Sequence, residues 1–351
     1  MNVLVVDDSA YQRLTLSAAL REIPRVTAVD TAASGEEAIR RVVSGRYDLV
    51  TLDIEMPGMD GFAVLRWLMV NRPLPVLVVS DRRHDRTALL ALELGAFHVM
   101  GKASARAGGL AAWKPSLAEA VEEAAQLRLD LLSQRARRQD PLTASGRFRV
   151  PRREARVLES ADPAGLVIAA STGGPPALRD LFSAIAVRPV IVGLVQHIPA
   201  PFTRSLAQRL TGATGWEARE AQEGMEARPG VIQVAPGDRH LVLEQQGSRI
   251  VTRLLPHGPE RRWCPSADLL FFSAAELFGA RATAVVLTGM GDDGAEGARA
   301  IAAAGGVVLC ESRESAVVSG MPDAAARAVP GAVREPLATL ATTVAERLSR
   351  L

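Results

Sequence analysis

Short apolar runs alternate with helical patterns along almost the whole 351-residue chain, and this alternation constrains the fold more than any other feature. Strands separated by helices build parallel sheets, because each helix carries the chain back across a face of the sheet before the next strand. The chain is too long for one core of ordinary size. We therefore expect two α/β domains.

The first domain is predicted over residues 1–125, as a doubly wound sheet of five parallel strands. The expected strands are Val3–Val6, Val26–Val29, Leu49–Leu52, Val76–Val79 and Phe97–Met100, and the expected helices are Tyr11–Leu20, Glu36–Val43, Phe62–Val70, Thr87–Leu94 and one that starts near Ser116. Ligands of such sheets bind beyond the carboxyl ends of the strands. Residues at these strand ends are therefore the functional candidates.

Acidic residues follow two of these strands. Asp7 and Asp8 end the first strand, and Asp53 ends the third. One interpretation is that these three acids are only turn and cap residues. Three carboxylates at one sheet edge repel one another unless a cation lies among them, and oxygen ligands in a partly hydrated site suit Mg²⁺. One carboxylate could then attack a phosphoryl donor, while the Ser80 hydroxyl and the Lys102 ammonium hold the phosphate oxygens.

With these residues, segment 1–125 resembles a response-regulator receiver domain, which has a flavodoxin-like fold. The resemblance implies that Asp53 accepts a phosphoryl group from a histidine kinase. It also implies that Asp8 and Asp53 bind Mg²⁺ directly, with Asp7 nearby and the backbone carbonyl of Glu55 as a further ligand.

The same resemblance makes Ser80 and Lys102 the residues that respond to the phosphoryl group. Receiver domains usually have proline after this lysine and often an aromatic residue three positions before it, whereas this chain has Ala103 and Val99. These departures do not threaten phosphate acceptance. They concern how the last strand and helix relay the signal.

Residues 126–162 are predicted to be an interdomain linker. A helical pattern continues to Gln139, and proline, serine and glycine residues follow. The segment between Gln126 and Ser160 contains nine arginines and four acidic residues. A solvated basic surface is one interpretation. Contact with an acidic surface, on a receptor or on a neighbouring domain, is the other.

The second domain is predicted over residues 163–351, as a doubly wound, mostly parallel α/β domain with a short antiparallel excursion near Pro236–His240. The expected strands are Leu166–Ala170, Val190–Val195, Val231–Ala235, Leu241–Leu243, Arg249–Arg253, Thr283–Leu287 and Gly306–Leu309, and the expected helices are Ala177–Ile185, Pro201–Leu210, Ala267–Leu277 and Ala295–Ala303.

The stretch Val167–Pro176 combines an apolar run, a serine, two glycines and two prolines. This order predicts a buried strand, a tight turn and the start of a helix. Such a turn raises Ser171 above the sheet and points backbone N–H groups at the space around it. A nucleophile, a phosphate-binding loop and an ordinary turn with a capping serine all fit this stretch alone.

Two further strand ends favour the nucleophile. His197 follows one apolar strand and Asp293 lies in a glycine-rich turn after another, which completes a serine–histidine–aspartate set. His240 and His257 are weaker candidates for the base, since they lie in a turn and in a Pro-Gly-rich loop. The order Ser-His-Asp disfavours an α/β-hydrolase. The absence of a Gly-x-x-x-x-Gly-Lys-Ser/Thr motif weakens a nucleotide-binding role.

These motifs resemble the catalytic domain of the chemotaxis protein-glutamate methylesterases (CheB family). The matching segments are Ile168–Pro175, Gln196–Pro199, Ala235–His240, Pro265–Phe271, Leu287–Gly294 and Gly320–Pro322. The resemblance implies a catalytic triad of Ser171, His197 and Asp293 and an oxyanion hole at the Met290 backbone N–H. Turn geometry adds the Thr172 N–H. The chain departs from the family at Trp263–Cys264 and Glu311–Ser312, which puts receptor preference more in doubt than chemistry.

The resemblance also implies the activity. The protein would be a phosphorylation-activated hydrolase that removes methyl esters from glutamates on the cytoplasmic helices of chemoreceptors and deamidates receptor glutamines. It would need Mg²⁺ for receiver phosphorylation and no cofactor for the esterase reaction. The unphosphorylated receiver would cover the substrate groove. A phosphorylation-gated binding module with a degenerate esterase site, or an esterase for receptors of another signalling system, stays open.

Composition excludes other classes of protein. A formal charge of +2 and 4% aromatic residues argue against a nucleic-acid partner. Neither a signal peptide nor an apolar stretch long enough to enter a membrane is found. The two cysteines, Cys264 and Cys310, are far apart and are expected to be reduced thiols. We therefore expect a cytoplasmic protein.

Overall fold

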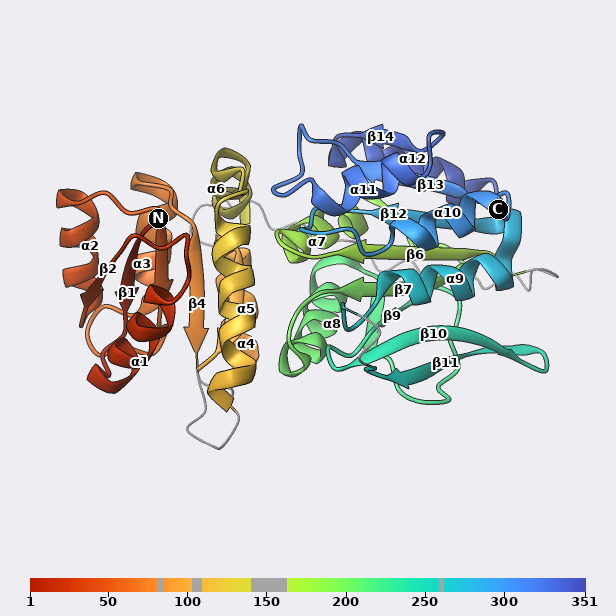
Figure 1. The fold of residues 1–351 in the computed structure, drawn as a ribbon. Coiled ribbons are helices and arrows are strands. Elements are labelled where there is room, and N and C mark those ends of the chain that lie inside the picture. The colour runs from red at the N-terminus through yellow and green to blue at the C-terminus, as the bar shows by residue number, and fades with distance from the viewer. Residues whose placement is uncertain (81–84, 103–108, 140–162, 259–261) are drawn as a thin grey trace. The chain divides into compact units, whose positions relative to one another are not determined.

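The computed structural model describes residues 1–80, 85–102, 109–139, 163–258 and 262–351. The chain divides into two compact units, unit 1 over Met1–Gly146 and unit 2 over Arg147–Leu351 (Figure 1). Each unit has a parallel sheet of its own, so each is described by itself.

Unit 1 contains one five-stranded parallel sheet with the order β2-β1-β3-β4-β5. Its elements are β1 (Asn2–Val6), α1 (Ala10–Arg21), β2 (Ala28–Ala32), α2 (Gly35–Ser44), β3 (Leu49–Leu52), α3 (Gly61–Asn71), β4 (Val76–Ser80), α4 (Asp85–Glu93), β5 (His98–Gly101), α5 (Gly109–Ala124) and α6 (Leu129–Gln139). The doubly wound fold predicted for this part of the chain is confirmed.

Helices on both faces bury the central strands of this sheet. Every residue of Val3–Val6 is at most 1% exposed, and β3 and β4 are also buried throughout. Such strands read as continuous apolar runs because neither face meets water. Edge strand β2 is more polar, and it begins two residues later than predicted, since its sequence Ala28–Ala32 has no apolar run.

Helix α5 starts earlier than predicted. The predicted start was near Ser116, whereas the helix begins at Gly109 and contains Pro115. The Trp113 indole N–H donates to the Gly101 carbonyl at 2.8 Å. This bond ties the first half of α5 to the end of β5. Ala103, which departs from the receiver pattern, lies outside the described residues.

Helix α6 lies within the segment predicted as a linker and packs on α3 and α4 of unit 1. Ala136 is buried next to Gly95, where an added Cβ would come within 2.9 Å of the Ala136 Cβ. Arg137 donates to the carbonyls of Met69 and Val70 at 3.1 and 3.0 Å. These are carbonyls of the last turn of α3, which have no partner within the helix, so a basic side chain stabilises them.

Unit 2 contains a seven-stranded sheet with the order β14-β13-β12-β6-β7-β9-β8, and every pair in it is parallel. Its strands are β6 (Gly165–Ala170), β7 (Ile191–Gln196), β8 (Glu217–Glu220), β9 (Val231–Val234), β12 (Ala282–Val286), β13 (Val307–Glu311) and β14 (Val333–Glu335). The helices are α7 (Gly174–Ala184), α8 (Ala200–Thr214), α9 (Ala267–Phe278), α10 (Ala295–Ala303), α11 (Gly320–Ala328) and α12 (Leu337–Ser349), with a 3-10 turn at Gly279–Arg281.

The predicted antiparallel excursion is the hairpin of β10 (Arg239–Gln246) and β11 (Arg249–Pro256), which forms a separate sheet beside α9. Its tight turn contains Gly247 at φ 61°, whereas the turn at Pro236 connects β9 to β10. The predicted strands omitted β8 and β14. Both are short, and β8 has the sequence Glu-Ala-Arg-Glu, so neither shows an apolar run.

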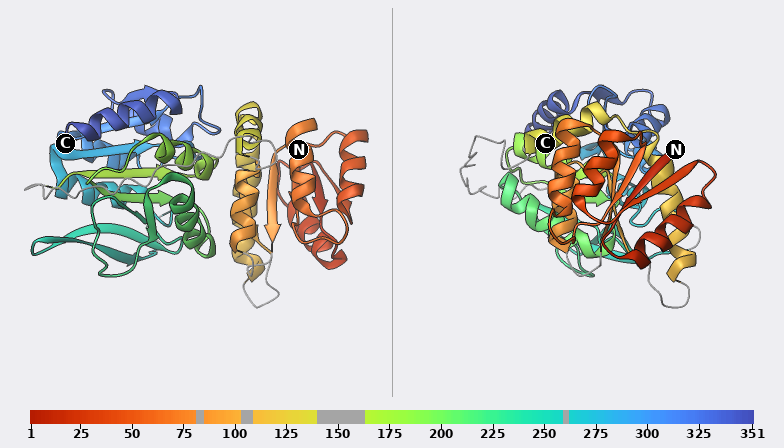
Figure 2. Two further views of the ribbon diagram at one scale, coloured as in Figure 1. Left: turned by 180° about the vertical axis from the view of Figure 1, so that it is seen from behind. Right: turned by 90° about the vertical axis from the view of Figure 1, so that its left-hand side faces the viewer.

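Helices cover both faces of the unit 2 sheet (Figure 2). α7 packs on α8 and α12. α10 packs between α9 and α11, and these three helices also contact strands of the sheet. The buried core between α9 and the sheet includes Val167, Phe271 and Ala284. Gly165 allows close packing there, because an added Cβ would lie 2.2 Å from the Phe278 ring. Within the described ranges, no helix is both long and apolar enough to span a bilayer.

The packing of α6 can be tested by overpacking. Ala136→Leu should destabilise unit 1 by about 1–3 kcal/mol, because no room exists between α6 and Gly95 for three more carbons. Hydrogen exchange of the α3 and β5 amides measures the effect. Gln134→Leu, which places the same side chain on the exposed side of α6, is the matched control. Equal protection in both variants would contradict this packing.

Candidate functional site

The strand order of unit 2 brings three strand ends together. β6 lies between β7 and β12, and the registers place Ala170 beside Gln196 and Ala169 beside Val286. Ser171 follows β6, His197 follows β7, and the loop after β12 reaches Asp293. The three residues predicted from separate motifs therefore lie at one edge of the sheet.

The turn after β6 has the geometry predicted for it. Gly173 takes a left-handed conformation, φ 74° and ψ 3°, as the residue before α7, and Pro175 and Pro176 lie in the first turn. The Ser171 carbonyl accepts hydrogen bonds from the Gly174 N–H and from the Gln196 side chain, both at 2.8 Å. Buried Gln196 thus stabilises the sharp turn that presents Ser171.

His197 and Asp293 are joined by a hydrogen bond. His197 Nε2 lies 2.8 Å from Asp293 Oδ2, and the His197 backbone N–H donates to the Ala170 carbonyl at 3.0 Å. The other ring nitrogen, Nδ1, is buried and has no hydrogen-bond partner among the described residues. With Nε2 bound to the carboxylate, Nδ1 is the nitrogen left to accept a proton.

Asp293 is held by the N-terminus of α9. Its Oδ1 accepts from the Ser266 hydroxyl and the Asp268 N–H, both at 3.1 Å, and its Oδ2 accepts from the Ala267 N–H at 2.7 Å. Burial alone would raise the pKa of Asp293, but the bonds from His197 and the α9 backbone outweigh it and hold the pKa below its usual range. The carboxylate is therefore ionised at neutral pH.

The loop after β12 lies against the Ser171 turn. Ser171 N–H donates to the Thr288 carbonyl at 2.9 Å, and a Cβ added to Gly289 would lie 2.7 Å from the Ser171 Cβ. The backbone N–H groups of Thr172 and Met290 make no hydrogen bond within the described ranges. They are thus available to a substrate oxygen.

Glu311 stabilises the loop after β12. Its carboxylate, 0% exposed, accepts from the Thr288 N–H at 2.9 Å and from the Ser315 hydroxyl at 2.8 Å. The Thr288 hydroxyl donates to the Thr172 carbonyl at 2.7 Å. Glu311 is one of the positions where this chain departs from the family pattern, and it fixes the loop through Thr288.

An aromatic side chain lies over His197. The Trp263 indole stacks on the imidazole with ring centroids 5.3 Å apart and an interplanar angle of 10°. The Arg262 guanidinium lies 4.6 Å from the centroid of the Trp263 ring. The indole also packs against Gly291, where an added Cβ would lie 2.7 Å away. Trp263 therefore forms an apolar wall beside His197.

Unit 1 has a second cluster at the carboxyl ends of β1 and β3. Carboxylate oxygens of Asp7, Asp8 and Asp53 lie within 4.8 Å of one another. Lys102 Nζ lies 2.6 Å from Asp53 Oδ2 and 2.9 Å from Asp7 Oδ2. Asp8 is exposed whereas the other two acids are buried. Carboxylate oxygens with one side open to solvent are the donor set that Mg²⁺ prefers, so these residues fit that cation.

Ser80 and Glu55 border the same cluster. The Ser80 Oγ is buried without a hydrogen-bond partner among the described residues, and the Ser80 carbonyl accepts from the Lys102 N–H at 3.0 Å. Glu55 N–H donates to Asp53 Oδ1 at 3.2 Å. Burial raises the pKa of the Asp53 carboxyl, and Lys102 opposes this shift.

Sequence reasoning missed the residues that hold the site together. Gln196 and Ser266 were part of recognised motifs, yet only the fold shows that they contact Ser171 and Asp293. Trp263 was noted as a departure, without its contact to His197. His240, a weaker candidate for the base, accepts from the Ser266 N–H at 3.1 Å. The roles predicted for the site residues remain predictions.

Two family models match the chain. Residues 166–344 match the model described as CheB methylesterase, which is just over half of the chain. Residues 3–113 match the model described as response regulator receiver domain. The two matches coincide with the two sheets.

Curated relatives align with this chain over most of its length. A "Protein-glutamate methylesterase/protein-glutamine glutaminase 1" of Myxococcus xanthus is 42% identical, over 92% of this chain and 90% of that protein. A relative of Geobacter sulfurreducens with the same name, numbered 3, is 40% identical with the same two coverages. The crystal structure of the Thermotoga maritima CheB methylesterase catalytic domain is 34% identical and covers 54% of this chain and 98% of that domain, with a TM-score of 0.50.

The low pKa of Asp293 predicts a pH-dependent contribution to stability. An acid with a lowered folded-state pKa stabilises the fold fully above its unfolded pKa of about 3.9, and this contribution is lost as the pH falls through the folded value. Asp293→Asn should therefore be less stable than the parent by a constant amount above about pH 5, and this difference should shrink below about pH 4. Urea unfolding from pH 7 to 3 measures it. Asp292→Asn, at the exposed neighbouring position, should show no such pattern. A difference that widens in acid would contradict the assignment.

Proposed function

The chain belongs to the CheB methylesterase family, and we propose that it hydrolyses methyl esters of glutamate side chains on the cytoplasmic helices of a chemoreceptor. Glutamines at the same receptor positions would be deamidated. The observation that carries the proposal is the 2.8 Å bond between His197 and Asp293 beside Ser171, which leaves the buried Nδ1 as the only basic nitrogen of the ring.

The proposed reaction begins with Ser171. Its hydroxyl attacks the γ-carbonyl carbon of the glutamyl ester while His197 Nδ1 accepts the hydroxyl proton. The tetrahedral intermediate expels methoxide, which takes this proton from His197 and leaves as methanol. Water then hydrolyses the acyl-enzyme with His197 again as base, which restores Ser171 and leaves a glutamate. With a glutamine, ammonia leaves in place of methanol.

Asp293 and two backbone groups would stabilise the charges that develop. The ionised carboxylate, fixed by the α9 backbone, would stabilise the imidazolium and hold the ring in the orientation that leaves Nδ1 for Ser171. The N–H groups of Thr172 and Met290, which have no other acceptor in the described ranges, would receive the oxyanion. Trp263 would exclude water from one side of His197.

Unit 1 contains a receiver domain, and such domains are phosphorylated in a reaction that usually depends on Mg²⁺. We propose Asp53 as the acceptor of a phosphoryl group from a histidine kinase. Asp8, Asp53 and the Glu55 carbonyl would hold the cation, with Asp7 nearby, and the cation would neutralise charge on the transferred group. Lys102 and Ser80, whose Oγ is buried without a partner in the described structure, would bind the phosphoryl oxygens.

We further propose that the receiver restrains the esterase until it is phosphorylated. The domain boundaries at about residues 125 and 162, the function of the arginine-rich segment and the cytoplasmic location remain predictions.

Removal of residues 1 to about 155 should release the restraint that the receiver places on the esterase and raise basal hydrolysis.

The esterase proposal is tested by methanol release from a methylated receptor fragment. Ser171→Ala should lower the rate by about 10⁴-fold or more, because the covalent route is lost. Ser183→Ala, on the exposed surface of α7, should leave it unchanged. Absence of release by the folded parent chain, with several receptors, would favour a binding module. Release from other classes of receptor only would place the esterase in another signalling system.

The switch is tested at the two ends of β3. A small phosphodonor with Mg²⁺ should raise methanol release by the parent chain, and Asp53→Asn should abolish that rise while basal release persists. Asp48→Asn makes the same change of charge at the amino end of the strand and should respond like the parent. A full response in Asp53→Asn would disprove its assignment as the acceptor.

A further inference from the structure

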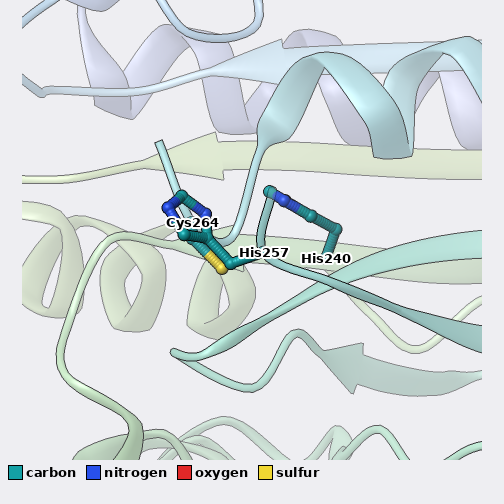
Figure 3. Close-up of side chains that lie close together, drawn as sticks. All are labelled: His240, His257 and Cys264. Atoms are coloured by element: carbon teal, nitrogen blue, oxygen red, sulfur yellow. The ribbon is translucent and has the colours of Figure 1, made fainter. Parts of the chain in front are cut away.

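A second group of metal-ligand side chains lies next to the esterase site. His240 in β10, His257 after β11 and Cys264 before α9 have ligand atoms within 4.8 Å of one another (Figure 3). The rings of His240 and His257 have centroids 5.8 Å apart. The hairpin register explains the meeting of the histidines, since Arg239 pairs with Pro256. None of the three is used by the proposed hydrolysis.

Two imidazoles and a thiol are a donor set for a zinc-type cation. Such a cation takes His nitrogens at about 2.0–2.1 Å and Cys sulfur at about 2.3 Å, which puts these ligand atoms about 3.3–3.6 Å apart in tetrahedral geometry. The ligand atoms already lie within 4.8 Å of one another, so side-chain rotation is enough to bring them to that spacing. His240 is buried, but His257 is exposed and Cys264 is half-buried, so the last two can move.

The local charge favours a cation. The Asp238 carboxylate acts on Cys264 more strongly than the Arg239 guanidinium does. Asp238 is exposed beside the cluster. This negative charge beside the cluster favours a metal cation there.

We propose that His240, His257 and Cys264 bind a zinc-type divalent cation, and that the bound cation inhibits the neighbouring hydrolase. A solvent molecule would complete four ligands, and the thiol proton would be released to solvent on binding. The inhibition rests on the proposed function, whereas the binding site does not.

Inhibition follows from the hydrogen bond of His240. Its Nδ1 accepts from the Ser266 N–H at 3.1 Å, and the Ser266 hydroxyl donates to Asp293. If Nδ1 ligates the cation, its lone pair is no longer available to accept the hydrogen bond from the Ser266 N–H. If Nε2 ligates, the ring proton moves to Nδ1 and faces the Ser266 N–H. In both cases the hydrogen bond between Ser266 and His240 breaks. Ser266, which precedes α9 and helps to hold Asp293, then loses His240 as a partner.

A second connection runs through the backbone. Cys264 directly follows Trp263, whose indole stacks on the His197 ring. A cation that fixes the Cys264 side chain would therefore change how Trp263 lies on that ring. The cation therefore acts on Asp293 through Ser266 and on His197 through Trp263, and both connections are absent from a metal site elsewhere on the surface.

Binding is measured with Co²⁺ alone added to the full chain, without substrate. A sulfur-to-cobalt charge-transfer absorption should appear and should vanish in Cys264→Ser. It should persist in Cys310→Ala, which leaves Cys264 as the only thiol of the chain. The Asp7–Asp8–Asp53 cluster has no sulfur and cannot produce this absorption. His257→Ala, at an exposed position, should weaken binding by at least about tenfold, since even the partners of metal ligands contribute about 10–100-fold to affinity.

Inhibition is measured with Zn²⁺ alone in the methanol-release assay. Zn²⁺ should lower hydrolysis by the parent chain by at least about fivefold, as typical coupling between sites predicts, and a chelator should restore it. Cys264→Ser and His257→Ala should hydrolyse like the parent without metal and should resist Zn²⁺.

Each outcome bears on a separate claim. No cobalt–thiolate absorption, or an absorption that survives Cys264→Ser, overturns the binding site. Equal inhibition of the parent and both variants places the inhibitory Zn²⁺ at another site and overturns the coupling. A parent chain without hydrolase activity contradicts the proposed function alone, because the absorption is read without substrate.

Discussion

The carboxylate of Asp293, bonded to the first backbone N–H groups of α9, is the contact on which the proposed esterase site depends. The backbone donors offset the free-energy cost of burying this charge. They are held in place because they belong to a helix that packs on the sheet. His197 takes its orientation from this carboxylate, and the bond decides which ring nitrogen is left without a partner in the described structure. The chemistry of the site is therefore built on the end of a helix that supplies no reacting atom.

The sheet topology explains why the site lies where it does. β6 comes first in the sequence and lies at the centre of the sheet; β7 adds on one side and β12 on the other. At such a point the chain connections diverge and leave a crevice at the carboxyl ends of the strands. Ser171 stands at the end of β6, so its neighbours on the two sides come from different halves of unit 2.

Much of this arrangement could be predicted, and the reasons for the omissions are physical. Buried parallel strands such as β1 and β6 are continuous apolar runs, so the pattern of the chain locates them. Edge strands β8 and β14 are short and polar, and only pairing with a neighbour defines them. Ser171, His197 and Asp293 lie in recognisable motifs. The stacking of Trp263 and the bond from Ser266 join segments that are distant along the chain, and no local pattern encodes them.

The growth of the sheet outward from β6 has a consequence for synthesis of the protein. A ribosome releases β6 and β7 with Ser171 and His197 long before it releases α9, β12 and Asp293. Until then the histidine lacks its carboxylate, and β6 lacks a neighbour on one side. A growing chain thus carries Ser171 and His197, the proposed nucleophile and base, before they can act together. Hydrolytic competence comes only with the later half of unit 2, after the receiver has already left the ribosome.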